Sequence, residues 1–211
     1  MNDDAPRATD PLVHDLAGGP ADPVDLDDAL ARFRAVAAAE GLLDVAFAPV
    51  DTPVGRLYPV RTEAGIVAIG WDRDAVLEQV AASVSPRVLE APARLDDVRR
   101  QLDEYFEHRR EHFDLPIDWS LTRGFRRDVL ESLHALPYGE VISYAGLAAR
   151  VGNPGATRAV GTAMAQNPLP IVVPCHRVLR SGGALGNYSG RNGVVTKRFL
   201  LEHEGALLPL T

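Results

Sequence analysis

The chain contains the stretch Asn167-Pro-Leu-Pro-Ile-Val-Val-Pro-Cys-His-Arg-Val178, in which an apolar run is followed by two residues with reactive side chains. The apolar run within this stretch ends at Cys175, the only cysteine, and His176 follows it directly. An imidazole beside a thiol can take its proton and leave a thiolate, which is a strong nucleophile. A buried cysteine beside a hydrogen-bonded histidine is the ordinary alternative. The flanking sequence has to decide between a nucleophile and a core residue.

The composition is that of an ordinary globular protein of 211 residues, long enough for one large domain or two small ones. One cysteine forms no internal disulfide, and the Cys and His spacings fit no structural zinc site. The N-terminus lacks the basic and apolar segments of a signal peptide, and no run of about 18 apolar residues follows. We therefore expect a cytoplasmic monomer with no membrane partner and no cofactor.

The formal charge of −7 is unevenly distributed along the chain. Residues 1–119 contain 12 Arg against 24 Asp or Glu, a charge of −12, whereas residues 120–211 contain 10 Arg or Lys against 5 Asp or Glu, a charge of +5. The overall charge argues against nucleic acid, whose binding is dominated by phosphate neutralisation. The basic half contains Cys175, however, which indicates an anionic ligand there; a solvated surface without a partner is the alternative.

Periodicity predicts an N-terminal extension followed by a small α+β domain over residues 41–119. Residues 1–40 are expected to form the extension, with a disordered tail and one helix that begins near Asp25 and ends at Gly41. The domain is predicted to contain an antiparallel meander of strands over 43–50, 56–62 and 66–71. It is predicted to continue with helices over 72–84 and 95–111 and a return strand or linker over 113–119.

Residues 120–211 are predicted to form a mainly helical domain. Thr122 is expected to cap a helix that runs to Leu136, and Ser143 is expected to cap a short helix. The later elements are predicted as helices over 144–151, 156–166 and 196–204, with a glycine-rich loop over 181–190. The first two of these, joined by a turn that contains glycine, fit a helix-turn-helix, although helical hairpins in bundles share the pattern.

The second helix of this pair has an unusual outer face. Arg158 stands there among small residues, namely Thr157, Ala159, Gly161, Thr162 and Ala163. A helix that reads the major groove usually carries several long polar side chains. Small residues around one arginine instead favour close approach to a narrow groove into which the arginine inserts.

The final helix offers a carboxylate that can orient His176, as the third member of a catalytic triad orients the base. Glu202 and Glu204 are both candidates, and spacing alone does not choose between them.

Five motifs stand in order along the C-terminal half. They are Pro137-Tyr-Gly-Glu-Val-Ile-Ser-Tyr144, Asn153-Pro-Gly-Ala-Thr-Arg-Ala-Val-Gly161, the stretch that ends at Val178, Gly186-Asn-Tyr-Ser-Gly190 and Leu200-Leu-Glu-His-Glu-Gly205. Together they resemble the O6-alkylguanine-DNA alkyltransferases, densely from Phe125 to Leu208 and more weakly upstream. The resemblance implies an α+β fold, with a small antiparallel-sheet N-terminal domain and a mainly helical C-terminal domain that holds the helix-turn-helix and the active-site cysteine.

The resemblance also implies a role for each matched catalytic residue. Cys175 is the implied alkyl acceptor, and His176 is the base that acts on it through a water molecule. Glu204, which directly precedes the glycine, is the implied carboxylate behind His176. Tyr144 is the implied donor of a proton or hydrogen bond to the departing guanine.

Matched residues also imply contacts with the substrate. Arg158 is implied to fill the space that a flipped nucleotide leaves in the duplex, and the small residues beside it to contact DNA, namely Thr157, Ala159 and Gly161. The implied substrate pocket is lined by Asn167, Pro170, Val178, Tyr188 and Ser189. Asn167 is also implied to brace the turn that holds the cysteine.

The implied activity is irreversible, stoichiometric transfer of an alkyl group from O6 of guanine in double-stranded DNA to Cys175. The implied enzyme is a methylated-DNA–protein-cysteine S-methyltransferase that acts once per molecule. It is implied to flip the nucleotide out of the duplex from the minor groove. A non-catalytic lesion sensor of the same fold is the first alternative, and a thiol hydrolase is the second. No metal is expected, because relatives that hold zinc use N-terminal cysteines that this chain lacks. His108 and His112 have an i, i+4 spacing, but a solvated helix face explains it more simply.

Overall fold

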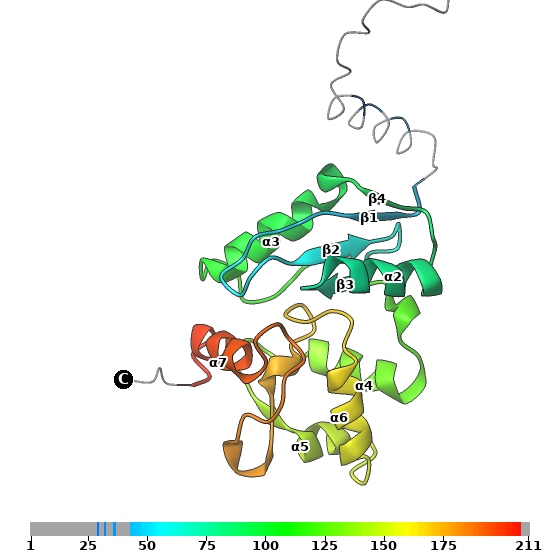
Figure 1. Ribbon diagram of the computed structural model, residues 1–211. Coiled ribbons are helices and arrows are strands. Elements are labelled where there is room, and N and C mark those ends of the chain that lie inside the picture. Colours follow the sequence, from blue (N-terminus) through cyan, green and yellow to red (C-terminus); the bar gives the residue numbers. More distant parts are fainter. Residues whose placement is uncertain (1–28, 30–31, 33–35, 37–42, 208–211) are drawn as a thin grey trace, which may run out of the picture.

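A computed structural model describes residues 29, 32, 36 and 43–207. Figure 1 shows a sheet domain packed against a mainly helical domain, which is the predicted fold class. The predicted extension, residues 1–40, lies almost wholly outside the described residues. Of its predicted helix only Ala29, Arg32 and Val36 are described, and each is helical.

The sheet contains the predicted antiparallel meander. Its strands are β1 (Val45–Phe47), β2 (Tyr58–Arg61) and β3 (Ile66–Gly70), and β2 pairs in antiparallel fashion with both neighbours. A fourth strand, β4 (Val88–Glu90), pairs in parallel with β1, so the strand order is β3-β2-β1-β4. Nothing in the sequence indicated β4, because it is a three-residue edge strand whose residues are all partly buried.

Two helices cover opposite faces of this sheet. Alternation along β1 sends Val45 and Phe47 to one face and Ala46 to the other. The first face packs on α2 (Arg73–Ser83), whose first turn is capped by the Asp72 side chain. The second face packs on α3 (Asp96–Phe106), which follows the 3₁₀ turn η2 (Pro92–Leu95).

The predicted helix over residues 95–111 is too long. It ends at Phe106, and His108 adopts the left-handed conformation with φ of 57°, which interrupts a helix. His108 therefore stacks on His203 with a centroid separation of 3.9 Å, while the His112 ring lies 3.4 Å from Asp114. The two histidines share no helix face. Among the described residues, no group of three or more His, Cys, Asp or Glu side chains is placed to hold a metal ion.

The helical domain contains η3 (Trp119–Leu121), α4 (Gly124–His134), α5 (Tyr144–Arg150), α6 (Thr157–Ala165) and α7 (Val194–His203). The predicted Ser143 cap is confirmed, since its Oγ accepts a hydrogen bond from the Gly146 amide at 2.9 Å. The predicted Thr122 cap is wrong. Its hydroxyl donates to the Trp119 carbonyl at 3.0 Å and closes η3, so α4 begins after Arg123.

A two-stranded sheet connects the two halves of the helical domain. β5 (Ile142–Ser143) pairs in parallel with β6 (Val178–Leu179), and Ile142 lies opposite Val178. β5 leads directly into α5, and β6 directly follows the 3₁₀ turn η4 (Cys175–Arg177). This pairing brings the start of α5 to the cysteine.

One buried apolar cluster extends through both domains. It includes Leu102 of α3, Leu130 of α4 and Leu200 of α7, together with Cys175 itself. The Ile69 amide of β3 also donates to the Pro168 carbonyl at 2.7 Å, which joins the sheet to the segment before the cysteine. The sheet domain therefore supports the site directly.

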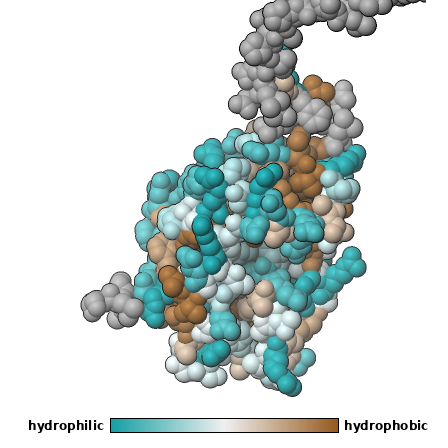
Figure 2. Space-filling model, viewed as in Figure 1, coloured by the Kyte–Doolittle hydropathy of each residue, from teal (hydrophilic) through white to brown (hydrophobic). Residues whose placement is uncertain are grey.

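The visible surface is mostly hydrophilic, with small apolar areas (Figure 2). One such area lies over α7, where Val194, Val195 and Phe199 are exposed. No helix among the described residues has the length and apolar character needed to cross a bilayer.

Candidate active site

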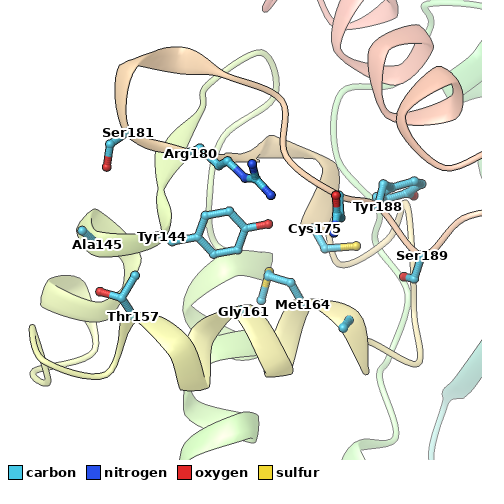
Figure 3. Close-up of a pocket in the computed structure, with 12 residues that line it drawn as sticks. Tyr144, Ala145, Thr157, Gly161, Met164, Cys175, Arg180, Ser181, Tyr188 and Ser189 are labelled. Atoms are coloured by element: carbon cyan, nitrogen blue, oxygen red, sulfur yellow. The ribbon is translucent and has the colours of Figure 1, made fainter.

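The β5–β6 pairing places Tyr144 and Cys175 on one cavity. Tyr144 is the first residue of α5, and Cys175 begins η4. Both line a cavity of about 620 Å³, and Figure 3 shows the Tyr144 hydroxyl and the Cys175 sulfur directed into it from two sides. A volume of this size suits a ligand as large as a purine base.

The turn before Cys175 is held by Asn167, as the sequence resemblance implied. Its Nδ2 donates to the Val173 carbonyl at 2.8 Å, and its Oδ1 accepts from the Leu169 amide at 3.0 Å. Between them, Ile171 has a φ of 75°, which is unfavourable for a β-branched residue. Such a conformation costs about 1–3 kcal/mol and persists only where its surroundings enforce it, so Asn167 fixes a strained turn that presents the thiol.

His176 is a buried, neutral base. Its Nε2 lies 2.8 Å from Glu204 Oε1, and because a carboxylate only accepts hydrogen bonds, Nε2 carries the hydrogen. Nδ1 is therefore unprotonated, and it is buried without a hydrogen-bond partner among the described residues. Burial lowers the pKa of His176 below its ordinary value and outweighs the opposing effect of Glu204. The ring consequently has one nitrogen free to accept a proton.

Glu204 is ionised and held by partners from two elements, η4 and α3. Arg177 donates to it twice, from Nε to Oε2 at 2.7 Å and from Nη2 to Oε1 at 3.0 Å. Tyr105 of α3 donates its hydroxyl hydrogen to Oε1 at 2.7 Å across the domain boundary. Burial alone would raise the pKa of Glu204, but His176 and Arg177 more than offset it and hold the pKa well below its ordinary range.

Cys175 is protonated at rest. Burial raises the pKa of its thiol above the ordinary value of 9.0, against opposing contributions from the Asn167 side chain and Lys197. Lys197 is itself fully buried and donates from Nζ to the Val178 carbonyl at 2.5 Å. Burial lowers the pKa of Lys197 to about 8. A protonated thiol needs a base before it can attack, and His176 is the neighbouring one.

Several residues predicted for the site line the cavity, namely Cys175, Tyr144, Thr157, Gly161, Tyr188 and Ser189. Asn167, Pro170 and Val178 were expected to line it and do not. Val178 is fully buried in β6, and Pro170 lies with Asn167 on a neighbouring hollow of about 460 Å³. Ser189 borders both spaces. Further lining residues that the sequence did not indicate are Ala145, Met164, Ala165, Arg180, Ser181 and Asn187.

Tyr188 closes one side of the cavity. Its hydroxyl is buried without a hydrogen-bond partner in the described structure, and burial raises the pKa of this phenol well above its ordinary value. Its ring contacts Trp71 of the sheet domain edge-on, with centroids 6.4 Å apart. Gly190 is required beside it, since a Cβ there would lie 2.2 Å from the Tyr188 ring. An unsatisfied hydroxyl beside a ligand-sized space is available to a bound molecule.

The outer face of α6 borders the same cavity. Thr157 and Gly161 line it, one helical turn apart. Arg158 and Ala159 are exposed and do not line the cavity, and the opposite face of the helix is buried through Val160. Of the small residues predicted for the outer face, Ala163 is wrong, because it is buried in the core. Arg158 does stand among exposed small residues, namely Thr157, Ala159 and Thr162.

Three buried residues that hold Glu204 or influence Cys175 were not predicted from the sequence, namely Arg177, Tyr105 and Lys197. Arg177 stands within residues 167–178, and a charged residue beside this apolar run is a usable signal. Lys197, the only lysine, gave a weaker one. Tyr105 gave none, because it lies 99 residues from Glu204 in the chain.

Comparisons with known proteins agree with this site. A family model described as "6-O-methylguanine DNA methyltransferase, ribonuclease-like domain" matches residues 45–119. One described as "6-O-methylguanine DNA methyltransferase, DNA binding domain" matches residues 124–206. The two matches together span most of the described chain.

Proteins named methylated-DNA–protein-cysteine methyltransferase are similar over most of their length. The one from Salmonella typhimurium is 54% identical over 167 residues, which cover 75% of this chain and 95% of that protein. The human one is 40% identical over 164 residues, which cover 74% and 78%. A crystal structure of Mycobacterium tuberculosis OGT in complex with DNA is similar with a TM-score of 0.65 and 34% identity, covering 76% of this chain and 93% of that one. The chain therefore belongs to the 6-O-methylguanine DNA methyltransferase family.

Proposed function

We propose that this protein repairs double-stranded DNA by transferring an alkyl group, methyl in the first place, from O6 of guanine to Sγ of Cys175, once per molecule. One observation carries the proposal: a buried cysteine and Tyr144 share a cavity of about 620 Å³, and the neutral His176 behind the cysteine is held by an ionised Glu204. The names of the relatives and the DNA-bound structure support the substrate class.

The substrate base has to leave the duplex before it can react. O6 of guanine lies on the major-groove edge of the stacked base pair, where a thiol within the cavity cannot reach it from the minor groove, so the nucleotide is extruded at a cost of about a few kcal/mol, which is lower for a mispaired lesion. The small residues Thr157 and Gly161 allow α6 to approach a narrow minor groove closely. Arg158, exposed between them, fills the vacated space and offsets part of that cost.

His176 then activates the thiol. Its unprotonated Nδ1 takes the Cys175 proton through one water molecule, and the resulting imidazolium is stabilised by Glu204 at 2.8 Å. Lys197, buried near the same sulfur, favours the thiolate by its charge. The nucleophile therefore forms inside the cavity, where it meets the alkyl carbon.

Transfer is a displacement at the alkyl carbon. A sulfur–carbon bond forms while the carbon–O6 bond breaks, and the electron pair of that bond stays with the guanine. Tyr144 donates a proton or hydrogen bond to the guanine, so full negative charge does not build up on the leaving group. Burial and the nearby Cys175 raise the pKa of Tyr144, which keeps this hydroxyl protonated until it is needed.

The product is a thioether on Cys175. General acids and bases such as those around Cys175 in the described structure do not hydrolyse a thioether. The protein is therefore consumed, and repair is stoichiometric.

Stoichiometry is the first test. With a duplex that contains O6-methylguanine in molar excess, methyl transfer should reach a plateau at a single methyl group per protein molecule. Cys175→Ala should bind the same duplex and transfer none. Continued turnover would instead indicate a hydrolase, and binding by the wild type without any transfer would indicate a lesion sensor.

A further inference from the structure

The arginines of the two domains differ in their pairing. In the sheet domain most described arginines have a carboxylate partner, as in Arg56–Asp51, Arg61–Asp97, Arg87–Asp44, Arg100–Glu104 and Arg110–Glu104. In the helical domain, the guanidinium groups of Arg150, Arg158 and Arg180 have no hydrogen bond or ion pair to any described residue. Exposed cations without a protein partner are available to an anionic partner.

Arg180 differs from the other two because it lines the cavity itself. It directly follows β6, and its backbone closes a tight turn. The Arg180 amide donates to the Ala184 carbonyl at 2.8 Å, and the Gly183 amide donates to the Arg180 carbonyl at 3.1 Å. Its side-chain stem crosses Gly186, where a Cβ would lie 3.2 Å from Arg180 Cγ. The turn and the missing side chain at residue 186 together set the direction of the guanidinium.

That direction leads to the mouth of the cavity. Figure 3 shows the Arg180 guanidinium reaching over the Tyr144 ring, on the cavity side of the loop that leads to Tyr188. Arg180 is exposed, whereas Cys175 on the floor of the cavity is only 3% exposed. A nucleotide whose base reaches Cys175 has to leave its sugar and phosphates at this mouth.

We propose that Arg180 binds a phosphodiester of the extruded nucleotide and so holds the flipped base in the cavity. The inference rests on the function proposed above. Arginine donates two parallel hydrogen bonds to phosphate oxygens, and such contacts fix position without reading sequence. The alkylated base is neutral, so the phosphodiester is the only anionic part of the substrate at this place.

Groups other than Arg180 act on the Cys175 thiol inside the cavity. Asn167 and Lys197 oppose the rise of the Cys175 pKa, and Arg180 is not among the main groups that shift it. Arg180 opposes the rise of the Tyr144 pKa, but burial and Cys175 outweigh it. Arg180 therefore belongs to substrate binding at the mouth rather than to activation of the thiol.

Substrates with and without phosphate separate these roles. Wild type, Arg180→Ala and Arg180→Lys are each reacted with free O6-benzylguanine, with O6-benzyl-2′-deoxyguanosine, with its 3′,5′-bisphosphate and with a duplex that contains O6-methylguanine. We expect wild type to react faster with the bisphosphate than with the nucleoside. Arg180→Ala should react no faster with the bisphosphate than with the nucleoside, and it should repair the duplex about tenfold more slowly, as expected for one lost charge-assisted contact. Arg180→Lys should keep part of the bisphosphate advantage and part of the duplex rate.

Salt dependence gives an independent readout. The slope of the logarithm of duplex affinity against the logarithm of salt concentration should become shallower by about 1 in Arg180→Ala, since one phosphate contact is lost. Arg123→Ala is the matched control, because Arg123 is an exposed arginine at the start of α4 that does not line the cavity. It should keep the bisphosphate advantage.

The outcomes distinguish this inference from the proposed function. An unmodified wild-type Cys175 after incubation with the duplex that contains O6-methylguanine would overturn the alkyl transfer itself. Equal losses for Arg180→Ala on the free base and the duplex would place Arg180 in the chemistry and overturn phosphate binding alone. A bisphosphate that reacts no faster than the nucleoside with wild type, or a duplex rate that Arg180→Ala leaves unchanged, would also overturn it.

Discussion

Glu204→Gln is expected to lower the free energy of unfolding by about 3–5 kcal/mol and to slow alkyl transfer by about 10²-fold, even to a free base. The substitution removes the negative charge that faces the buried Arg177 and replaces one of the two acceptor oxygens by an NH₂ donor, so Arg177 loses one of its two bonds to residue 204. The neutral amide can turn either its oxygen or its NH₂ group toward His176, so it no longer fixes which nitrogen of His176 carries the hydrogen. Urea denaturation and single-turnover kinetics measure the two effects.

Glu202→Gln is the matched control on the same helix. The Glu202 side chain is partly exposed, and its Oε1 lies 3.6 Å from Arg198 Nη1 without a hydrogen bond to any described residue. We therefore expect an effect of about 0–1 kcal/mol on stability and no loss of rate. A Glu204→Gln protein that is folded, as judged by circular dichroism, and reacts at the wild-type rate would contradict the role of the His176–Glu204 pair.

Acid gives a further check on Glu204. Because its pKa in the folded protein lies well below the ordinary 4.5, its contribution to stability is complete above that pH and is lost as the pH falls further. The difference in unfolding free energy between wild type and Glu204→Gln should therefore shrink as the pH is lowered below 4.5. A difference that stays constant there would mean that the carboxylate is not the source of the stability.

Arg158→Ala is expected to slow repair of duplex DNA by about 10²-fold and to leave the reaction with free O6-benzylguanine unchanged. Arg158 is exposed beside the cavity and lines none of it, so it cannot contact a base that is already bound there. It acts on the duplex, where filling the vacated space offsets part of an extrusion cost of a few kcal/mol, and about 2.7 kcal/mol corresponds to 10²-fold.

Two comparisons sharpen the Arg158 test. Arg123→Ala removes an equal charge away from the cavity and should repair the duplex normally. With the nucleoside bisphosphate, Arg158→Ala should react like wild type, whereas Arg180→Ala should not, because only the latter is assigned to a phosphate. Equal losses for Arg158→Ala on the duplex and the free base would show that Arg158 does not serve extrusion.

Local patterns predicted the parts of the fold that local interactions determine. The Ser143 cap and the meander of β1 to β3 follow from short-range hydrogen bonding and alternation, and both are present. The end of α3 was misplaced because it depends on the left-handed conformation of a single residue, His108, which no periodicity signals. β4 was missed because three partly buried residues give no pattern of their own.

The site residues that lie within sequence motifs were predictable. The contacts between residues that are far apart in the sequence were not, because they depend on how the domains pack. The choice of Glu204 over Glu202 came from the glycine that follows it, and the structure places Glu204, not Glu202, against His176. The Tyr105 contact with Glu204 depends on how the two domains pack, which the sequence does not state. For the same reason Val178, next to the reactive pair in the sequence, faces away from the cavity within β6.

The location of the transferred group tests the central claim most directly. After incubation with a duplex that contains O6-methylguanine, mass spectrometry of the digested protein should show the peptide with Cys175 heavier by one CH₂ group, with the modification on the cysteine sulfur. An unmodified Cys175 peptide from protein that has fully bound the duplex, or a methyl group on another residue, would contradict the claim.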